Sequence, residues 1–136
     1  MSNLFDDFQS FEFPTKTSAV YALGIESKNQ FVPFYIGETT DLDRRISEYL
    51  NPNFDAPTDF RVGEAIKYLK ARGYVVIFKF KLSDNPEEEE KAYTERTEKE
   101  ITDKLLRGSY DYKTSDPEAE RKRAWSEVDE FLRGIP

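Results

Sequence analysis

The alternation of apolar and polar residues predicts three short strands. Residues 18–25 and 31–37 are apolar stretches rich in β-branched and aromatic side chains, and the polar residues between them favour an antiparallel hairpin. Pro33 has no N–H to donate, so we expect it at an edge of the sheet. Residues 74–82 are apolar at first and alternate later, which predicts a third strand that is buried on both faces at its start.

Apolar positions at helical spacing predict two helices between the second and third strands. Thr40 or Asp41 can cap the first of these helices, which extends to Leu50. Asp59 is the expected cap of the second helix, and Gly73 is expected to end it because glycine tolerates the left-handed backbone found after many helices.

Two further helices are predicted after the third strand. Residues 87–106 form a long helix with acidic residues in its first turn, and Asp116 begins the last helix. The resulting fold class is α/β: a small three-stranded antiparallel sheet flanked by helices in the order β-β-α-α-β-α, followed by a C-terminal helix. We divide the chain into a Phe-rich N-terminal arm (1–17), one domain (18–107) and a C-terminal helix packed on or extending that domain (108–136).

Composition restricts the chemistry that the chain can perform. Its 136 residues include 20 Lys and Arg against 27 Asp and Glu, a formal net charge of -7, which excludes a protein that coats nucleic acid through overall positive charge. Cysteine and histidine are both absent, so disulfides, Cys/His zinc sites, thiol nucleophiles and histidine triads are excluded. A bound metal would have oxygen ligands, which favours Mg²⁺, Mn²⁺ or Ca²⁺.

The chain shows no apolar run of the roughly 18–20 residues that a membrane span needs. Its N-terminus also lacks the basic and apolar regions of a secretory signal. We therefore expect a cytoplasmic protein that does not contact membranes.

Two tyrosine motifs and one arginine resemble a known family. The triplet AVY ends at Tyr21, the triplet YIG runs from Tyr35 to Gly37, and Arg45 follows eight residues after Gly37. This arrangement resembles the GIY-YIG endonuclease superfamily, with AVY in place of the usual GIY. The stretch YIGETTDLDRRISEYL is most similar to the nuclease domain of the bacterial excision-repair protein UvrC and to related small members. The resemblance covers residues 18–106.

The resemblance also implies a metal-binding glutamate on the helix after the third strand. Family members often carry it as Glu-x-x-Leu or Glu-x-x-Ile, and Glu98 with Ile101 fits that spacing. Helical phase places Glu98 at the edge of the apolar face that includes Ile101. A carboxylate in that position is costly unless something pairs with it, and a divalent cation would do so.

The implied activity is that of a metal-dependent DNA endonuclease, which hydrolyses phosphodiester bonds. Arg45 would meet the negative charge that develops on the phosphate, and Tyr21 and Tyr35 would hydrogen-bond the phosphate or the attacking water. The resemblance gives Tyr21 the role of proton acceptor, and Glu98 would hold Mg²⁺ or Mn²⁺. Further substrate contacts are expected from Gly37, Thr39, Arg44 and Tyr49.

The expected partner is DNA, in repair or in the DNA metabolism of a phage or mobile element. Sequence specificity in so small a domain would need a protein partner or a second copy in a homodimer. We expect no nucleotide cofactor.

Three features favour an alternative class of function. Glu38 directly follows the YIG triplet, where a carboxylate repels phosphate, AVY departs from GIY, and the net charge is negative. These features are typical of a GIY-YIG-like domain with weakened catalysis that binds a protein partner, or nucleic acid without cutting it. A third hypothesis is that the acidic residues 87–100 mimic nucleic acid, although a solvated helix explains the same composition.

Overall fold

The computed structural model describes residues 8, 17–96 and 110–135, and shows the predicted α/β architecture. The described elements follow in the order β1 (Ala19–Ser27), β2 (Gln30–Thr39), α1 (Leu42–Leu50), α2 (Pro57–Ala71), β3 (Val76–Leu82), α3 (Pro86–Arg96) and α5 (Pro117–Arg133). The strands form one antiparallel sheet of three strands in the order β2-β1-β3.

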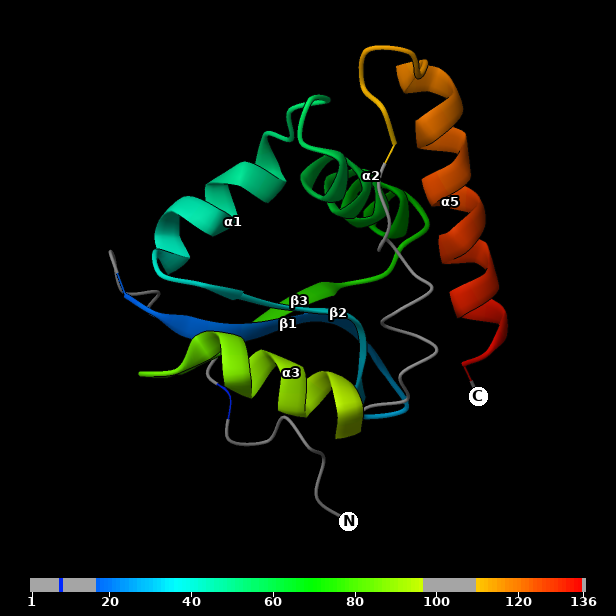
Figure 1. Cartoon of the computed structure of the whole chain (residues 1–136). Coiled ribbons are helices and arrows are strands. Elements are labelled where there is room, and N and C mark those ends of the chain that lie inside the picture. The colour runs from blue at the N-terminus through cyan, green and yellow to red at the C-terminus, as the bar shows by residue number, and fades with distance from the viewer. Residues whose placement is uncertain (1–7, 9–16, 97–109, 136) are drawn as a thin grey trace.

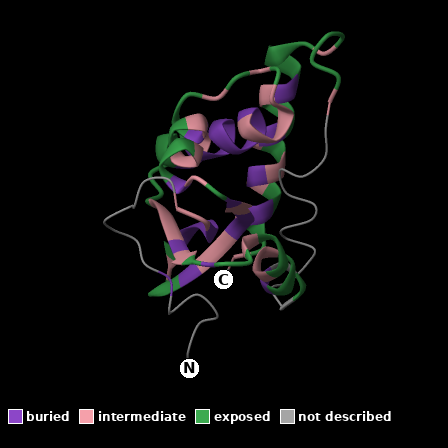
Figure 2. Cartoon of the chain, turned by 60° about the vertical axis from the view of Figure 1, so that its left-hand side comes forward, coloured by how far each residue is buried: buried purple, intermediate pink, exposed green. Residues whose placement is uncertain are grey.

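Helices cover both faces of this sheet. Figure 1 shows α1 and α2 over one face, α3 under the other, and α5 running beside α2. Alternate residues of β1 serve the two sides: Tyr21 and Leu23 join the larger apolar core beneath α1 and α2, whereas Val20 and Ala22 join a smaller one toward α3. Figure 2 shows buried residues concentrated in the strands and in α2.

The central strand is β1 and not β3. All of β1 from Ala19 to Ile25 is buried, whereas β3 pairs with β1 as a partly exposed edge strand. The prediction that residues 74–82 begin as a strand buried on both faces is therefore wrong: Val75 is 71% exposed and precedes the strand. An apolar run shows that a segment pairs in a sheet, but its place in the strand order depends on the rest of the chain.

The predicted hairpin is confirmed, and it contains an irregularity that affects the site. Lys28 and Asn29 at its turn both have positive φ, as in the tight turns that match the twist of paired strands. The register shifts opposite Leu23 and Gly24, which leaves Phe34 unpaired as the extra residue of a bulge. Phe34 and Tyr35 consequently both join the larger core. Pro33 lies on the edge strand β2, as expected.

The helix ends agree with the sequence prediction at three places and disagree at one. Asp41 caps α1 by accepting a hydrogen bond from the Arg44 backbone N–H, and Asp116 caps α5. Gly73 follows α2 with φ +89°. Asp59 does not cap α2, because the helix already begins at Pro57, where proline fits the first turn.

The terminal segments are described in part. Phe8 of the predicted N-terminal arm is buried and meets Tyr93 of α3 edge to face, with ring centroids 5.2 Å apart. The predicted helix at 87–106 begins at Pro86, and its residues 97–106 lie outside the described part of the chain. Among the described helices, none has the length and apolarity needed to cross a bilayer.

Candidate active site

The hairpin brings both tyrosine motifs to one end of the sheet. Tyr21 of β1 is paired with Gly37 of β2, and Tyr35 lies two positions earlier on that strand. The Tyr21 hydroxyl occupies the space that a Cβ on residue 37 would need, so an alanine there would collide with it. The glycine of the YIG triplet therefore makes room for the tyrosine of the first motif.

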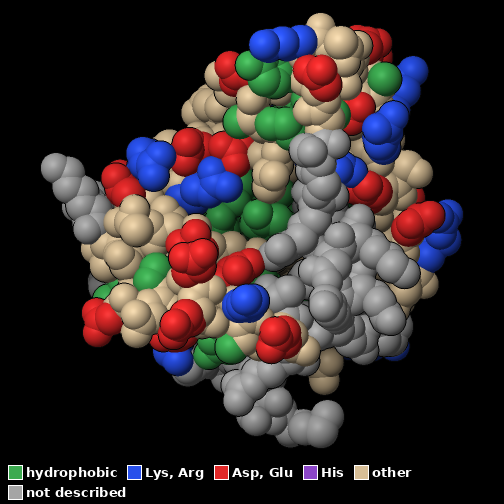
Figure 3. Space-filling model, viewed as in Figure 1, with side chains coloured by type: hydrophobic (Ala, Val, Ile, Leu, Met, Phe, Trp, Pro, Cys, Tyr) green, Lys and Arg blue, Asp and Glu red, His purple; other side chains and the backbone are tan. Residues whose placement is uncertain are grey.

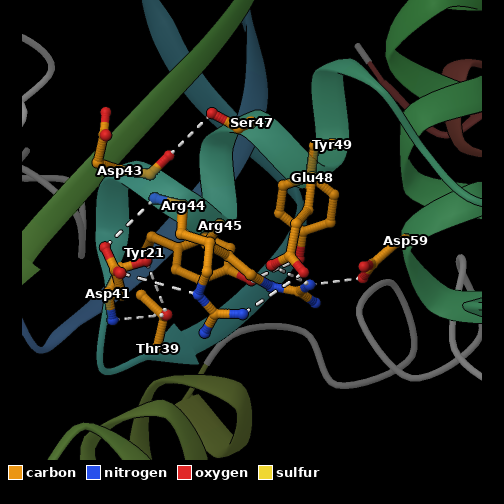
Figure 4. A network of polar contacts seen from close by, with 10 residues as sticks. All are labelled: Tyr21, Thr39, Asp41, Asp43, Arg44, Arg45, Ser47, Glu48, Tyr49 and Asp59. Atoms are coloured by element: carbon orange, nitrogen blue, oxygen red, sulfur yellow. Dashed lines mark hydrogen bonds and ion pairs between the residues drawn. The ribbon is translucent and has the colours of Figure 1, made fainter. Parts of the chain in front are cut away.

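Helix α1 places Arg45 against Tyr21. Arg45 Nε donates a hydrogen bond of 3.2 Å to the Tyr21 hydroxyl. One turn later, the Tyr49 ring lies 4.6 Å from the Arg45 guanidinium carbon, and the Tyr49 hydroxyl contacts the Tyr21 hydroxyl in a short hydrogen bond. The opposite side of the guanidinium meets Asp59 of α2, at 2.6 Å from Arg45 Nη1 (Figure 4).

Tyr21 and Arg45 border a pocket of about 340 Å³. Its described lining comprises Tyr21, Tyr35, Gly37, Glu38, Arg45, Thr58 and Glu90. Figure 3 looks onto this face, where basic and acidic side chains lie together over α1, further acidic side chains lie toward α3, and apolar surface lies between them. The described part of this lining thus includes one basic residue, two acidic residues and two tyrosines.

Burial controls the protonation of the tyrosines. The pKa of Tyr21 is raised, mainly because burial disfavours a charged phenolate and secondly because Tyr35 is close, while Arg45 and Tyr49 act in the opposite direction. Burial likewise raises the pKa of Tyr49. For Arg45, burial alone would lower the pKa, but Tyr21, Tyr49 and Asp59 outweigh it, so the pKa is raised. At neutral pH the site therefore holds neutral phenols beside a permanent cation.

The predicted substrate contacts occupy different positions. Gly37 lines the pocket, whereas Thr39, Arg44 and Tyr49 are not part of its described lining. Thr39 is buried and bonds the backbone of Asp41 in the turn that leads into α1. Arg44 is 59% exposed and pairs with Asp41 and Glu48 on the outer side of α1. Tyr49 is 2% exposed and reaches the pocket through Tyr21, so direct substrate contact by these three residues stays a prediction.

Glu98, the predicted metal ligand, lies outside the described residues. The sequence prediction gives no role to Glu90 of α3, although Glu90 lines the pocket together with Glu38. The helical spacing could have predicted that Glu90 faces the sheet. Glu90 lies three residues before Tyr93, on the same side of the helix, and the Tyr93 side chain is buried toward the sheet.

Comparisons with known proteins give this chain no relative: no family model, no curated protein and no solved structure matches it. Function must therefore be argued from the site itself.

Proposed function

We propose that this protein is a metal-dependent DNA endonuclease of the GIY-YIG type. The observation that supports the proposal most strongly is the meeting of Tyr21, Tyr35 and Arg45 in one pocket, although they come from two strands and a helix. These are the residues on which the sequence resemblance rests. An arginine beside two phenols suits a substrate that gains negative charge during reaction, as a phosphodiester does.

Arg45 has the geometry of a phosphate-binding group. Its side chain is 20% exposed, so it is largely removed from water yet open to the pocket. Its planar guanidinium is always charged and presents several N–H donors in a fixed arrangement. It would stabilise the charge that develops on the phosphate oxygens.

Tyr21 is placed to hold a water or a phosphate oxygen. When Tyr49 donates the hydrogen bond between their hydroxyls, the Tyr21 oxygen accepts from both Tyr49 and Arg45, and its own hydrogen is left for the pocket. Both bonds favour negative charge on Tyr21, although burial keeps its pKa raised. Tyr21 would therefore orient the attacking water as a neutral phenol, and it would accept the proton of that water only while its own hydroxyl proton passes to a phosphate oxygen.

The proposed activity would use a hard divalent cation such as Mg²⁺ or Mn²⁺. Glu38 and Glu90 supply the oxygen ligands that these ions prefer, and Glu98 remains a predicted ligand. Within residues 8, 17–96 and 110–135 no group of three or more acidic side chains could hold a metal, so water and phosphate oxygens would complete the coordination. When bound, the ion supplies positive charge that offsets the charge developing on the phosphate.

The test is the nicking of supercoiled plasmid DNA in the presence of Mg²⁺. We expect Arg45→Ala to lower the nicking rate by about a hundredfold or more, because one preorganised donor to the transition state is lost. Arg133→Ala is the matched control, since Arg133 is exposed at the end of α5. Failure of the wild-type protein to cut supercoiled, branched or damaged DNA would contradict the proposal.

Glu38 supports a second candidate function. Its carboxylate lines the pocket at the place where phosphate would enter, and it repels a polyanion unless a cation intervenes. A domain that binds a protein partner without cutting DNA would tolerate this charge. Pull-down at high salt separates the two, because contacts with DNA phosphates weaken steeply with salt whereas an apolar protein interface does not.

A further inference from the structure

Asp59 carries a largely buried carboxylate whose position the helix does not explain. It lies in the first turn of α2, where a negative charge interacts favourably with the helix dipole, but it provides no cap, because α2 begins at Pro57 and the residue at the cap position is Ala56, which has no capping side chain. Its side chain is 13% exposed and turns toward α1. Thr58, its neighbour, lines the pocket, so this turn of α2 forms one wall of the candidate site.

The Asp59 carboxylate forms an ion pair with the Arg45 guanidinium. Asp59 Oδ1 lies 2.6 Å from Arg45 Nη1, a short ion pair in which both side chains are mostly buried. Glu48 also contacts Arg45 Nη1, with its Oε1 at the longer distance of 3.4 Å. The Asp59 pair joins α1 to α2, whereas Glu48 lies on the same helix as Arg45.

These contacts leave one nitrogen of the guanidinium for a ligand. Nε donates a hydrogen bond to Tyr21, Nη1 forms an ion pair with Asp59 and a hydrogen bond with Glu48, and the Tyr49 ring lies against the guanidinium carbon. Among the described residues, Nη2 has no hydrogen-bond partner. With two nitrogens fixed on opposite sides, the plane of the group is set and Nη2 is the donor available to a substrate oxygen (Figure 4).

We propose that Asp59 is a positioning residue, which holds the Arg45 guanidinium in the orientation that presents Nη2 to a phosphate oxygen. The inference rests on the proposed function, in which Arg45 meets the phosphate. Without Asp59, Arg45 keeps its bond to Tyr21 but can rotate about it, and donors that are misplaced by about 1 Å lose much of their effect on rate. The opposite hypothesis is that Asp59 competes with the substrate for Arg45, in which case its removal raises activity.

Kinetics of plasmid nicking distinguish the two hypotheses. We expect Asp59→Ala to lower kcat by about tenfold or more while KM for DNA changes much less, because orientation and not attraction is lost. Asp59→Asn, which keeps the shape and one acceptor oxygen, should lie between wild type and Asp59→Ala, and Asp59→Glu should restore part of the rate. Asp55→Asn is the matched control, because Asp55 is exposed in the loop before α2. An unchanged or increased kcat in Asp59→Ala overturns the proposal.

A second measurement does not depend on activity. In protein labelled with ¹⁵N-arginine, the Nε–H signal that disappears in Arg45→Lys reports on the guanidinium. We expect Asp59→Ala to shift this signal and to speed its hydrogen exchange by about tenfold, whereas Asp55→Asn leaves it unchanged. If wild-type protein cuts no DNA, the proposed function fails, and this signal alone decides about Asp59: a shift supports the positioning role, and an unchanged signal overturns it.

Discussion

The hydroxyl of Tyr21 is where the contacts of the site meet. It accepts a hydrogen bond from Arg45, contacts the Tyr49 hydroxyl, and lies over the backbone of Gly37. Its ring stacks on Phe78 of β3, at 5.2 Å between centroids, which fixes its direction from the other side. A change at any of these neighbours should therefore act on the site through Tyr21.

Gly37→Ala tests whether the site depends on the position of the Tyr21 hydroxyl, because it adds a single methyl group beside it. The new methyl group collides with the Tyr21 hydroxyl, so we expect the ring to move, nicking to fall at least tenfold, and the free energy of unfolding to fall by about 1–3 kcal/mol. Urea denaturation and the nicking assay measure the two effects. Gly134→Ala is the control, because a Cβ there meets its nearest neighbour at an ordinary 3.5 Å. Wild-type nicking by Gly37→Ala would show that the position of Tyr21 does not matter.

At the scale of elements, local patterns predicted more of the fold than of the site. The sequence predicts Thr40 or Asp41 as the cap of α1 and Asp116 as the start of α5, and the structure shows Asp41 and Asp116 in the cap positions, because cap chemistry is local to the helix end. Asp59 was misassigned because its residue type suits a cap, whereas Pro57 marks the true start and the carboxylate serves Arg45 on another helix. Such a contact between α1 and α2 leaves no trace in the spacing of either helix.

Contacts between separate elements also explain why the sequence did not predict Glu90 as a pocket residue. The family spacing directed attention to Glu98, while the lining of the pocket depends on how α3 crosses the end of β2. Helical phase could have identified Glu90 through its distance from Tyr93, but the sheet face that Tyr93 covers was not known. The tyrosine and arginine motifs were identifiable because they lie on the adjoining elements β1, β2 and α1.

Helix α3 supplies a prediction about the metal. If Glu90 binds the metal as proposed, Glu90→Gln removes one charged oxygen ligand, so the concentration of Mg²⁺ that gives half-maximal nicking should rise on the order of tenfold. Glu87→Gln, an exposed change one turn earlier on the same helix, should leave that concentration unchanged. Titration of nicking against Mg²⁺ measures both. Equal behaviour of the two variants would remove Glu90 from the site.

At the scale of the whole molecule, α5 packs into the apolar core that also contains Tyr21 and Tyr35. Phe131 of α5 packs on Phe34, the bulge residue next to Tyr35, with centroids 6.0 Å apart. Arg121 of α5 also bonds the buried Glu64 of α2 at 2.7 Å. The C-terminal helix, which lies outside the resemblance, is thus an integral part of the folded unit.

The buried phenols predict the alkaline stability of the fold. Tyr21 and Tyr49 have raised pKa values in the folded protein, so the unfolded chain releases their protons first, above the ordinary value of 10.0. Stability is complete below about pH 10 and is lost as pH rises further. Tyr49→Phe removes one such proton, so above pH 10 its unfolding free energy should fall less steeply, by about 1.4 kcal/mol per pH unit.

Urea denaturation between pH 9 and about 11.5 measures these slopes. Tyr112→Phe is the matched control, because Tyr112 is 43% exposed, and it should keep the wild-type slope. If Tyr49→Phe also keeps the wild-type slope, Tyr49 is not a buried neutral phenol in solution.

Nicking of supercoiled plasmid in Mg²⁺ by Tyr21→Phe, Arg45→Ala and the double variant tests the central claim most directly. If the two side chains act as one unit on the phosphate, wild-type protein cuts, each single variant loses about a hundredfold or more, and the double variant is hardly slower than the poorer single one. No cutting by wild-type protein, or losses that multiply in the double variant, would contradict a single phosphate-hydrolysing site at Tyr21 and Arg45.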